Sequence, residues 1–598
     1  LLGAYKDSGT TMESIVTEYA NRALAFRAMQ DATVRNGNQY LWKDQDKPNS
    51  LPETILPAGG FYNTQTRTME SYDFRASATY NTTLNNDHII NTYLGSEVNS
   101  QDRVSRWMDG WGMQYDSGLT PFWDYRAFKR LTEKNWDYYG LSKSFGRSVA
   151  FFANATYSYK GRYTITGTTR YEGTNRLGRT RKARWLPTWN ISGAWNAHSE
   201  DFFEKQHLLS HLTLKGSYSL VGVAPSWVTN SRAIIYSRSA WRPSAGQSEN
   251  RNYIGSFENE DLTYEKKHEL NFGIDMGMLK NRLNIAADIY WRNNFDLIGA
   301  AYTIGGTRWG NVASMKSHGF ELSISTKNIQ TKDFSWTTDF IFGSTFNKVT
   351  ELDTKRNMFN FLTGNGFARQ GYPVRSLFSI PFTGLDDEGF PTFMVNGKEV
   401  TRRNYRDINF QQVDDLDFLK YEGSSEPTYN GSFGNVFTFK NFKLNVFITY
   451  SGGNKLRLDP SFYASYSDLW ATPKEYRNRW TTLGDERKTD IPVIASVRDH
   501  YSYSNLGTGY AAYNYSTARV ADGSFVRLKE VSLTYTLPTP LIKRLGFLKS
   551  ASFKVQATNL ALLYADKKLY GQDPEFFRSG GVATPLPKQV TATVHIGF

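Results

Sequence analysis

Several groups of residues in this sequence have side chains that could support catalysis or metal binding. His207 and His211, in "HLLSH", have the spacing that brings two imidazoles to one helix face, but the glutamate of an H-E-x-x-H zinc site is missing. They also lie between two strand patterns, which favours a polar turn. The acidic run 407–418 lacks the glycine and final glutamate of a calcium loop. Asp124 or Asp485 could pair with another carboxylate for acid–base chemistry, but the sequence brings no two of them together.

Nucleotide and cysteine chemistry are also poorly supported. The segment 507–512, "GTGYAA", imitates a dinucleotide-binding motif, but no strand pattern precedes it and no helix pattern follows, so we predict a loop there. The chain has no cysteine, which excludes disulfides and thiolate sites. We therefore predict that the protein is not an enzyme and holds no metal or cofactor.

The net charge is +13, which raises the question of an anionic partner. The densest basic cluster is "RTRKAR", residues 179–184, but 57 acidic residues are interspersed with the 70 basic ones and no basic stripe dominates. Nucleic acid is therefore not expected. Solvated loops explain the charge, and contact with the phosphates of outer-membrane lipopolysaccharide is a further possibility.

The elements that must position any site are strands with two unlike faces. Residues 269–293 alternate at period two through a turn at Lys280-Asn281. The apolar row holds Leu270, Phe272, Ile274, Met276 and Met278, then Leu283, Ile285, Ala287, Ile289 and Trp291. Asp275 and Asp288 fall on the other face, which cannot be a dry core unless both are paired. A water-filled lumen on that side explains the pattern, and similar hairpins are predicted over 151–171 and 437–453.

The connections alternate between tight turns and long loops, the latter at roughly 95–145, 221–262, 350–430 and 452–522. This alternation is typical of a transmembrane β-barrel, whose strands need about 9–11 residues to cross a bilayer. No apolar run is long enough for a transmembrane helix. Aromatic residues make up 15% of a chain whose mean hydropathy is −0.53, as interface girdles would require.

The domain organisation is a single barrel over residues 1–598 with long extracellular loops. Composition barely changes along the chain, and we find no linker. Residues 11–29 are rich in alanine and favour a helix, so residues 1–60 are expected to include an outer-loop insert with a helical segment.

An ordered series of segments resembles the barrel of SusC/RagA-like TonB-dependent outer-membrane transporters of Bacteroidetes. The series includes 51–97, "FFANATYSYKGRYTITGTTRYEGTNRLG" with "LPTWNISGAWNAHSEDFF" (151–203), 265–298, 477–492, "DGSFVRLKEVSLTYTLP" (522–538), 555–563, 573–576 and the terminal Phe598. The resemblance implies an all-β antiparallel barrel of family type with 22 strands. It also implies an N-terminal plug, the TonB complex as energised partner, and a SusD-like surface lipoprotein as lid. The plug, the TonB-contacting segment and the first strands are expected to be absent from these 598 residues.

The resemblance also implies import of a nutrient oligomer, an oligosaccharide or in some members a peptide, held between outer loops, lumen and lid. Aromatic faces and planar polar groups suit such ligands. The candidate substrate-binding residues are Trp107, Asp109, Trp111, Trp123 and Asp124 in one long loop, and Trp470 and Tyr476 in another. The alternative is that these rings pack loops together. Trp291 and Phe598 are assigned to the membrane interface and the barrel end.

Three other functions remain open at this point: a siderophore or vitamin receptor, a passive or structural barrel, and a soluble glycan-binding β protein. The final strand, "VTATVHIGF" (590–598), places Val590, Ala592, Val594 and Ile596 on one face. We expect this face to meet lipid. In a closed barrel the strand would pair with the first one, and that partner is expected to be missing here.

Overall fold

The computed structural model describes most of the chain. The described residues are 1–25, 41–42, 46, 49, 51, 53–54, 59–122, 125, 128, 137–203, 207–225, 233–242, 247–303, 306–354, 356–466, 474–577 and 587–598. No helix in this part of the chain has both the length and the apolar content needed to cross a bilayer.

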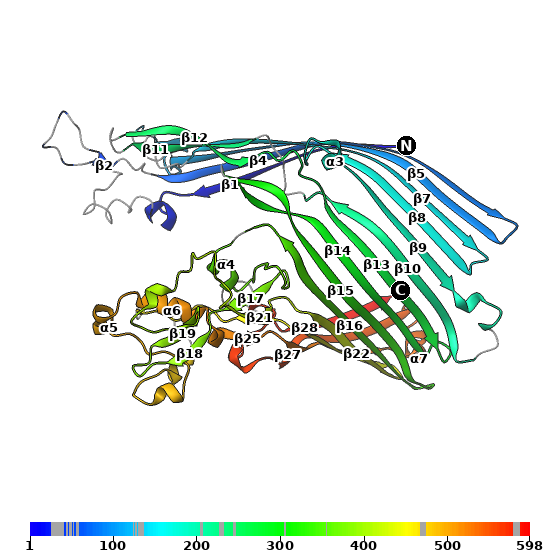
Figure 1. Ribbon diagram of the computed structural model, residues 1–598. Helices are drawn as coiled ribbons and strands as arrows, with labels where there is room; N and C mark the ends of the chain where they lie inside the picture. Colours follow the sequence, from blue (N-terminus) through cyan, green and yellow to red (C-terminus); the bar gives the residue numbers. More distant parts are fainter. Residues whose placement is uncertain are drawn as a thin grey trace.

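The main feature of the fold is one strongly curved sheet of 19 strands (Figure 1). Sixteen of them follow one another as antiparallel neighbours: β1 (Leu2–Val16), β4 (Gly60–Leu84), β5 (His88–Gln114), β7 (Tyr139–Tyr159), β8 (Tyr163–Thr174), β9 (Trp185–Asn196), β10 (Leu209–Val223), β13 (Glu265–Met278), β14 (Leu283–Thr303), β15 (Gly306–Gln330), β16 (Phe334–Leu352), β22 (Tyr429–Phe439), β23 (Phe442–Gly452), β26 (Phe525–Thr536), β27 (Ser550–Tyr564) and β28 (Gln589–Gly597). The other three are β6 (Thr120–Pro121), β11 (Ala233–Arg242) and β12 (Gln247–Phe257). Among the described pairings β1 joins only β4 and β28 only β27, so these strands do not close into a ring.

The predicted two-faced strands are confirmed by the register. Leu270 pairs with Trp291 and Phe272 with Ile289 on one face, which we call the outer face. The inner face carries Asp288, opposite Glu321 of β15. On β14 the apolar row runs from Leu283 to Trp291, nine residues, which is the span a tilted strand needs to cross a bilayer. The sheet is therefore built to separate lipid on its outer face from water on its inner face.

The two ends of the sheet differ as predicted. Tight turns join the strands at one end, for example at Lys160-Gly161 and Lys440-Asn441, where Lys160, Gly161 and Lys440 have positive φ. The long connections 353–428 and 453–524 leave the other end, at the left of Figure 1. The predicted loop 95–145 is wrong in part, because β5 continues to Gln114 and β7 begins at Tyr139.

The predicted helix over residues 11–29 is also wrong at its start. Residues 11–16 belong to β1, which pairs with β4 from Leu2–Arg75 to Val16–Phe61, and a helical turn occurs only at 21–25. The remaining residues 26–29 lie outside the described part of the chain. Pairing with the long edge of β4 outweighs the weak helix propensity of this segment. At least residues 2–16 of the expected outer-loop insert are therefore part of the sheet.

The connections 353–428 and 453–524 fold together into a compact unit, which we call the loop domain. Its elements are α4 (Met358–Leu362), β17 (Ser376–Ser379), β18 (Phe382–Leu385), β19 (Pro391–Val395), β20 (Lys398–Val400), β21 (Lys420–Ser424), β24 (Lys455–Arg457), α5 (Val497–Ser502), α6 (Leu506–Asn514) and β25 (Val520–Asp522). Helix α6 contains the segment 507–512, which we predicted as a loop. Its Tyr510 and Tyr513 are buried with Tyr405, Phe378 and Phe393 in one core, and this burial stabilises the helix.

Arg457 links the two halves of the loop domain. Its guanidinium donates to the carbonyl oxygens of Leu362 (3.3 Å), Ser516 (2.8 Å) and Phe378 (2.5 Å), and to Ser379 Oγ (3.1 Å). Burial lowers the pKa of Arg457 to about 10, so the side chain still carries its charge at neutral pH. One buried cation thus satisfies acceptors from both connections.

The first prediction tests the assignment of the two faces. Leu322 and Ser323 are neighbours on β15 and lie on the outer and inner face, respectively. We expect Leu322→Arg to lower the unfolding free energy in lipid vesicles by about 2–4 kcal/mol, because it places a charge in the apolar band. The matched variant Ser323→Arg should change it by less than about 1 kcal/mol, and equal losses in a urea titration would contradict the assignment.

The second prediction concerns Arg457. The variant Arg457→Met leaves buried carbonyl groups without a donor, so we expect the loop domain to lose about 3 kcal/mol or more. Hydrogen exchange of the α6 amides measures this loss, while the β13–β14 amides serve as an internal reference. Arg375→Met is the control, since Arg375 is half exposed and its nearest carboxylate contact, Glu426, is 3.7 Å away. Unchanged α6 protection in Arg457→Met would refute the linking role.

Candidate functional site

Three of the predicted substrate-binding residues lie on a strand. Trp107, Asp109 and Trp111 belong to β5, whose pairing continues to Met113 on the β4 side and to Met108 on the β7 side. They were expected in a loop because the apolar alternation stops near residue 98. A strand that extends beyond the bilayer has water on both faces, so its sequence no longer alternates even though its backbone still pairs.

All three side chains lie on the inner face of β5 near the end that bears the long connections. Their neighbours on β4 are Gln65, Asn63 and Phe61. Trp107 lies over Gly140, where a Cβ atom would come within 2.2 Å of the indole nitrogen, so the glycine makes room for the ring. Trp107 and Asp109 remain partly exposed. They could offer a ring face and a carboxylate to a ligand in the lumen.

Trp111 has a different environment from the other two. It is 8% exposed, and its ring centroid lies 5.2 Å from that of Phe128 and 6.4 Å from that of Tyr138. These contacts fit the packing alternative for this ring. Of the remaining candidates, Trp123, Asp124 and Trp470 lie outside the described residues.

Tyr476 lies in the core of the loop domain. It is 6% exposed, with ring centroids 4.9 Å from Phe462 and 5.1 Å from Tyr466. Its hydroxyl is buried and has no hydrogen-bond partner among the described residues. These surroundings match the packing alternative for Tyr476 as well.

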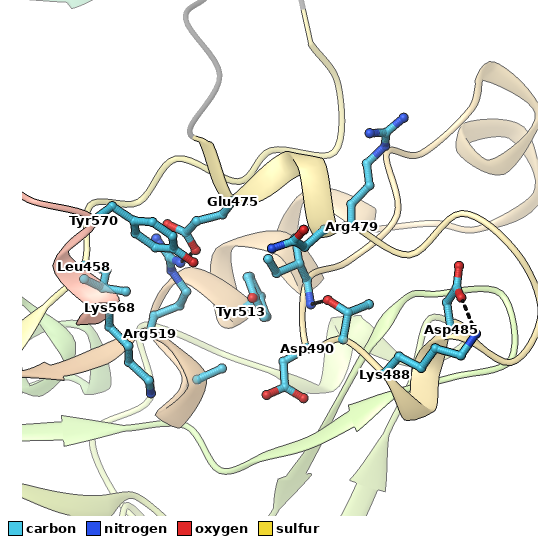
Figure 2. Close-up of a pocket in the computed structure, with 14 residues that line it drawn as sticks. Leu458, Glu475, Arg479, Asp485, Lys488, Asp490, Tyr513, Arg519, Lys568 and Tyr570 are labelled. Atoms are coloured by element: carbon cyan, nitrogen blue, oxygen red, sulfur yellow. Dashed lines mark hydrogen bonds and ion pairs between the residues drawn. The ribbon is translucent and has the colours of Figure 1, made fainter. Parts of the chain in front are cut away.

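A cavity of about 510 Å³ opens beside this core (Figure 2). Tyr513 and Tyr570 supply its aromatic surface, and its rim is charged. The charged lining residues are Glu475, Arg479, Asp485, Lys488, Asp490, Arg519 and Lys568. Because Lys568 and Tyr570 follow β27, a third connection takes part in this wall.

Some of these charges are already committed to one another. Arg519 and Glu475 form a buried ion pair, and Lys488 Nζ lies 3.2 Å from Asp485 Oδ1. Thr481 donates to Asp485 and, with Lys488, holds the pKa of Asp485 below its usual range. Asp490 has no ion-pair partner among the described residues. The cavity could therefore offer hydrogen bonds and one free carboxylate to a polar ligand.

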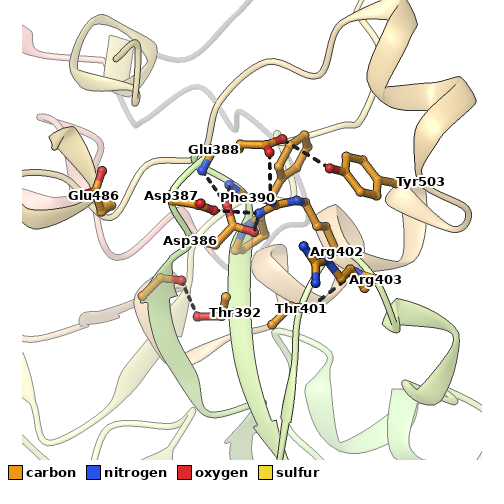
Figure 3. Close-up of polar contacts among 12 residues, drawn as sticks. Asp386, Asp387, Glu388, Phe390, Thr392, Thr401, Arg402, Arg403, Glu486 and Tyr503 are labelled. Carbon is orange, nitrogen blue, oxygen red and sulfur yellow. Dashed lines mark hydrogen bonds and ion pairs between the residues drawn. The ribbon is translucent and has the colours of Figure 1, made fainter. Parts of the chain in front are cut away.

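A second charged cluster in the loop domain is structural (Figure 3). Arg402 is 6% exposed and forms ion pairs with Asp386, with Asp387 (3.2 Å) and with Glu388 (2.9 Å). Burial opposes its charge, but hydrogen bonds with Tyr503 and Asp386 raise the pKa of Arg402. The cluster fixes the turn that ends at Gly389, which lies against the ring of Trp480. Its carboxylates are therefore engaged in holding the turn.

The two residues assigned to the membrane interface lie on the sheet as follows. Trp291 is on the outer face of β14, 45% exposed, with its ring 6.5 Å from that of Phe272. Phe598 directly follows β28 and is 73% exposed. Their interface and barrel-end roles stay predictions.

The buried arginines 402, 457 and 519 were missed from sequence. The local signal was weak: Arg457 stands between Leu456 and Leu458, a charge inside an apolar pair. No group of three or more histidine, aspartate or glutamate residues in the described part of the chain is arranged to hold a metal ion.

Known proteins resemble this chain over much of its length. The family model "TonB dependent receptor-like, beta-barrel" matches residues 4–450. TonB-dependent receptor P39 of Formosa agariphila is 24% identical over 584 residues, 89% of this chain and 53% of that protein. TonB-dependent receptor SusC of Bacteroides thetaiotaomicron is 28% identical over 223 residues, 34% of this chain and 21% of SusC. Three relatives match most of this chain, and the chain spans about half of the length of each of them.

Solved structures show the same fold. The structure described as the RagAB peptide transporter superposes with a TM-score of 0.70 at 21% identity, covering 90% of this chain and 56% of that one. The two-faced sheet, its tight turns at one end and its long connections at the other agree with this match. The chain therefore belongs to the family of TonB-dependent receptor-like β-barrels of the outer membrane, and it is similar to SusC and RagAB over the shares given above.

Proposed function

We propose that the protein is the barrel of a two-component importer that carries a nutrient oligomer across the outer membrane. The observation that carries this proposal is the inner-face position of Trp107 and Asp109, at the end of the sheet from which the loop domain projects. A ligand that enters the lumen from this end of the sheet would pass these side chains. Energy would come from the TonB complex through a plug domain, which the described residues do not include.

We infer that the substrate is an oligosaccharide. The partly exposed indole of Trp107 suits a sugar ring, and the neighbouring carboxylate of Asp109 suits its hydroxyl groups. A peptide is the second candidate, and two observations favour it. The loop-domain cavity carries side chains of both charges, and the RagAB fold relative is described as a peptide transporter.

The rival functions are less well supported. A soluble glycan-binding protein would have no use for the apolar outer face, and a passive barrel would not need ordered ring and carboxylate groups in its lumen. A siderophore or vitamin receptor fits the ordered sequence resemblance less well than a SusC-type importer.

The partner we propose is a SusD-like surface lipoprotein that closes the loop end. Helix α5 supports this assignment, because Val497 and Tyr501 are four residues apart on one helix face and are 73% and 88% exposed. The helix has a complete capping box from Ser496 and Asp499, which stabilises its first turn, and its two apolar side chains remain uncovered. Such an ordered apolar projection suits a protein contact.

The third prediction tests the lumen site. We expect Trp107→Ala combined with Asp109→Asn to reduce uptake of a labelled oligosaccharide, at concentrations below saturation, by about 10-fold or more, as for loss of an aromatic anchor. Met108→Ala is the matched control, since Met108 is the intervening residue on the opposite face. Growth on peptides, measured in parallel, distinguishes the second substrate class.

Unchanged uptake of both substrates in the double variant would contradict the lumen site. A large, constant conductance of the complete native protein in black lipid membranes would contradict gated import itself.

The fourth prediction tests the lid. We expect Val497→Asp with Tyr501→Asp to reduce copurification of the lipoprotein at least 10-fold, because charges would be buried in an apolar contact. Lys332→Asp, at the end with the tight turns, is the control. Equal recovery of the lipoprotein with wild type, the double variant and the Lys332→Asp control would show that α5 takes no part in the contact.

A further inference from the structure

The outer face of the sheet changes abruptly from apolar to cationic across β13–β16. Cross-strand register defines its rows. One row holds Leu270, Trp291, His318 and Phe346, and the next row toward the long connections holds His268, Asn293, Lys316 and Lys348. Two residues along each strand therefore separate a largely aromatic row from a polar row that contains two lysines.

A groove of about 410 Å³ lies across this boundary. Tyr218 and His268 stack in it with ring centroids 5.7 Å apart and an interplanar angle of 14°, and Tyr218 Oη lies 3.3 Å from His268 Nδ1. Trp291, His318 and Lys316 also line the groove. The surface thus combines an apolar floor with polar and cationic groups on the side nearer the long connections.

The two lysines pose an electrostatic problem. Lys316 and Lys348 are directly opposite each other on antiparallel strands, where like charges destabilise the pairing. Within the described part of the chain neither has a carboxylate within 4.0 Å. The nearby carboxylates are engaged elsewhere: Glu351 accepts from Ser314 Oγ at 2.8 Å, and Asp296 pairs with Lys266 at 2.7 Å. An anion between the two ammonium groups would turn the repulsion into two charge-assisted hydrogen bonds.

We propose that this groove, together with Lys348 beside its lining residue Lys316, binds a phosphate-bearing glycolipid of the outer leaflet, with the phosphate between the two lysines. The lysines lie one row above the apolar band, at the depth of headgroups, and toward the long connections, which face the cell exterior in such barrels. The acyl chains then lie along Leu270, Phe272 and Phe320. The site is on the opposite face from Trp107 and does not depend on the transported substrate.

A soluble phosphate could satisfy the lysines but would gain nothing from the aromatic row. A glycolipid uses both parts of the groove, because its sugar would lie beside Trp291 and the stacked Tyr218–His268 pair while its chains cover the band. The amphipathic layout of the groove therefore favours the lipid.

The fifth prediction is measured by native mass spectrometry of the full chain in detergent. The probes are a phosphorylated lipid A, the same lipid after removal of its phosphates, and inorganic phosphate. We expect wild-type protein to bind the phosphorylated lipid at least 10-fold more tightly than the dephosphorylated one. Lys316→Gln with Lys348→Gln should weaken binding of the phosphorylated lipid about 30-fold, the effect of two lost lysine contacts near a membrane surface.

Lys316→Arg with Lys348→Arg should bind as wild type, and Lys398→Gln with Lys420→Gln, which removes the same charge from the loop domain, should change nothing. If the double glutamine variant does not assemble, each single variant carries the test with an expected loss of about 5-fold. Wild-type affinity in the glutamine variants, equal binding of both lipids by wild type, or full displacement of the lipid by inorganic phosphate would each overturn the proposal.

Discussion

The structure depends on one constraint: the backbone of a strand in lipid has no water to hydrogen-bond with. Every backbone N–H and C=O group in the apolar, membrane-crossing part of the sheet (the band) must therefore pair with a neighbouring strand. Pairing at period two then decides which side chains meet lipid, and a slip of one residue would invert both faces. Across β13–β16 the irregularities in register respect this limit. They occur at Asn294–Leu297, Leu297–Ile298, Ser314–Met315 and Lys327–Ile329, which flank the apolar rows. In these four strands the irregularities lie outside the apolar rows, where water can solvate the backbone.

This constraint explains how much of the fold the sequence predicted. Within the band the pattern is dictated by lipid on one face and water on the other, so the hairpin at 269–293 was predicted correctly down to its turn. Beyond the band, water contacts both faces of each strand, so the sequence no longer alternates between apolar and polar residues. That is why the loop was expected to begin near residue 95, inside what is β5, and why β1 was mistaken for the start of a helix.

The loop domain obeys different physics and was much harder to predict. It is stabilised as a water-soluble core, with Tyr405, Tyr510 and Phe378 almost fully buried. Part of the aromatic surplus that suggested membrane girdles belongs to this core. Its contacts join segments that are far apart in sequence, as Arg457 does with Phe378 and Ser516. No local spacing of residues predicts such contacts. The candidate site was predictable only as residue types: Trp107 and Asp109 lie partly exposed on a strand and stay predictions as ligand residues, whereas Tyr476 is a core residue.

The union of two connections around Arg457 has a consequence for how such barrels diversify. Neither 353–428 nor 453–524 has a complete core of its own, because the core takes apolar side chains from both and Arg457 of the second donates to carbonyl oxygens of the first. A recombination event that replaced one connection would leave the other without part of its core. The heritable unit of variation at this rim is therefore the pair of loops together with the hairpin β22–β23 that lies between them.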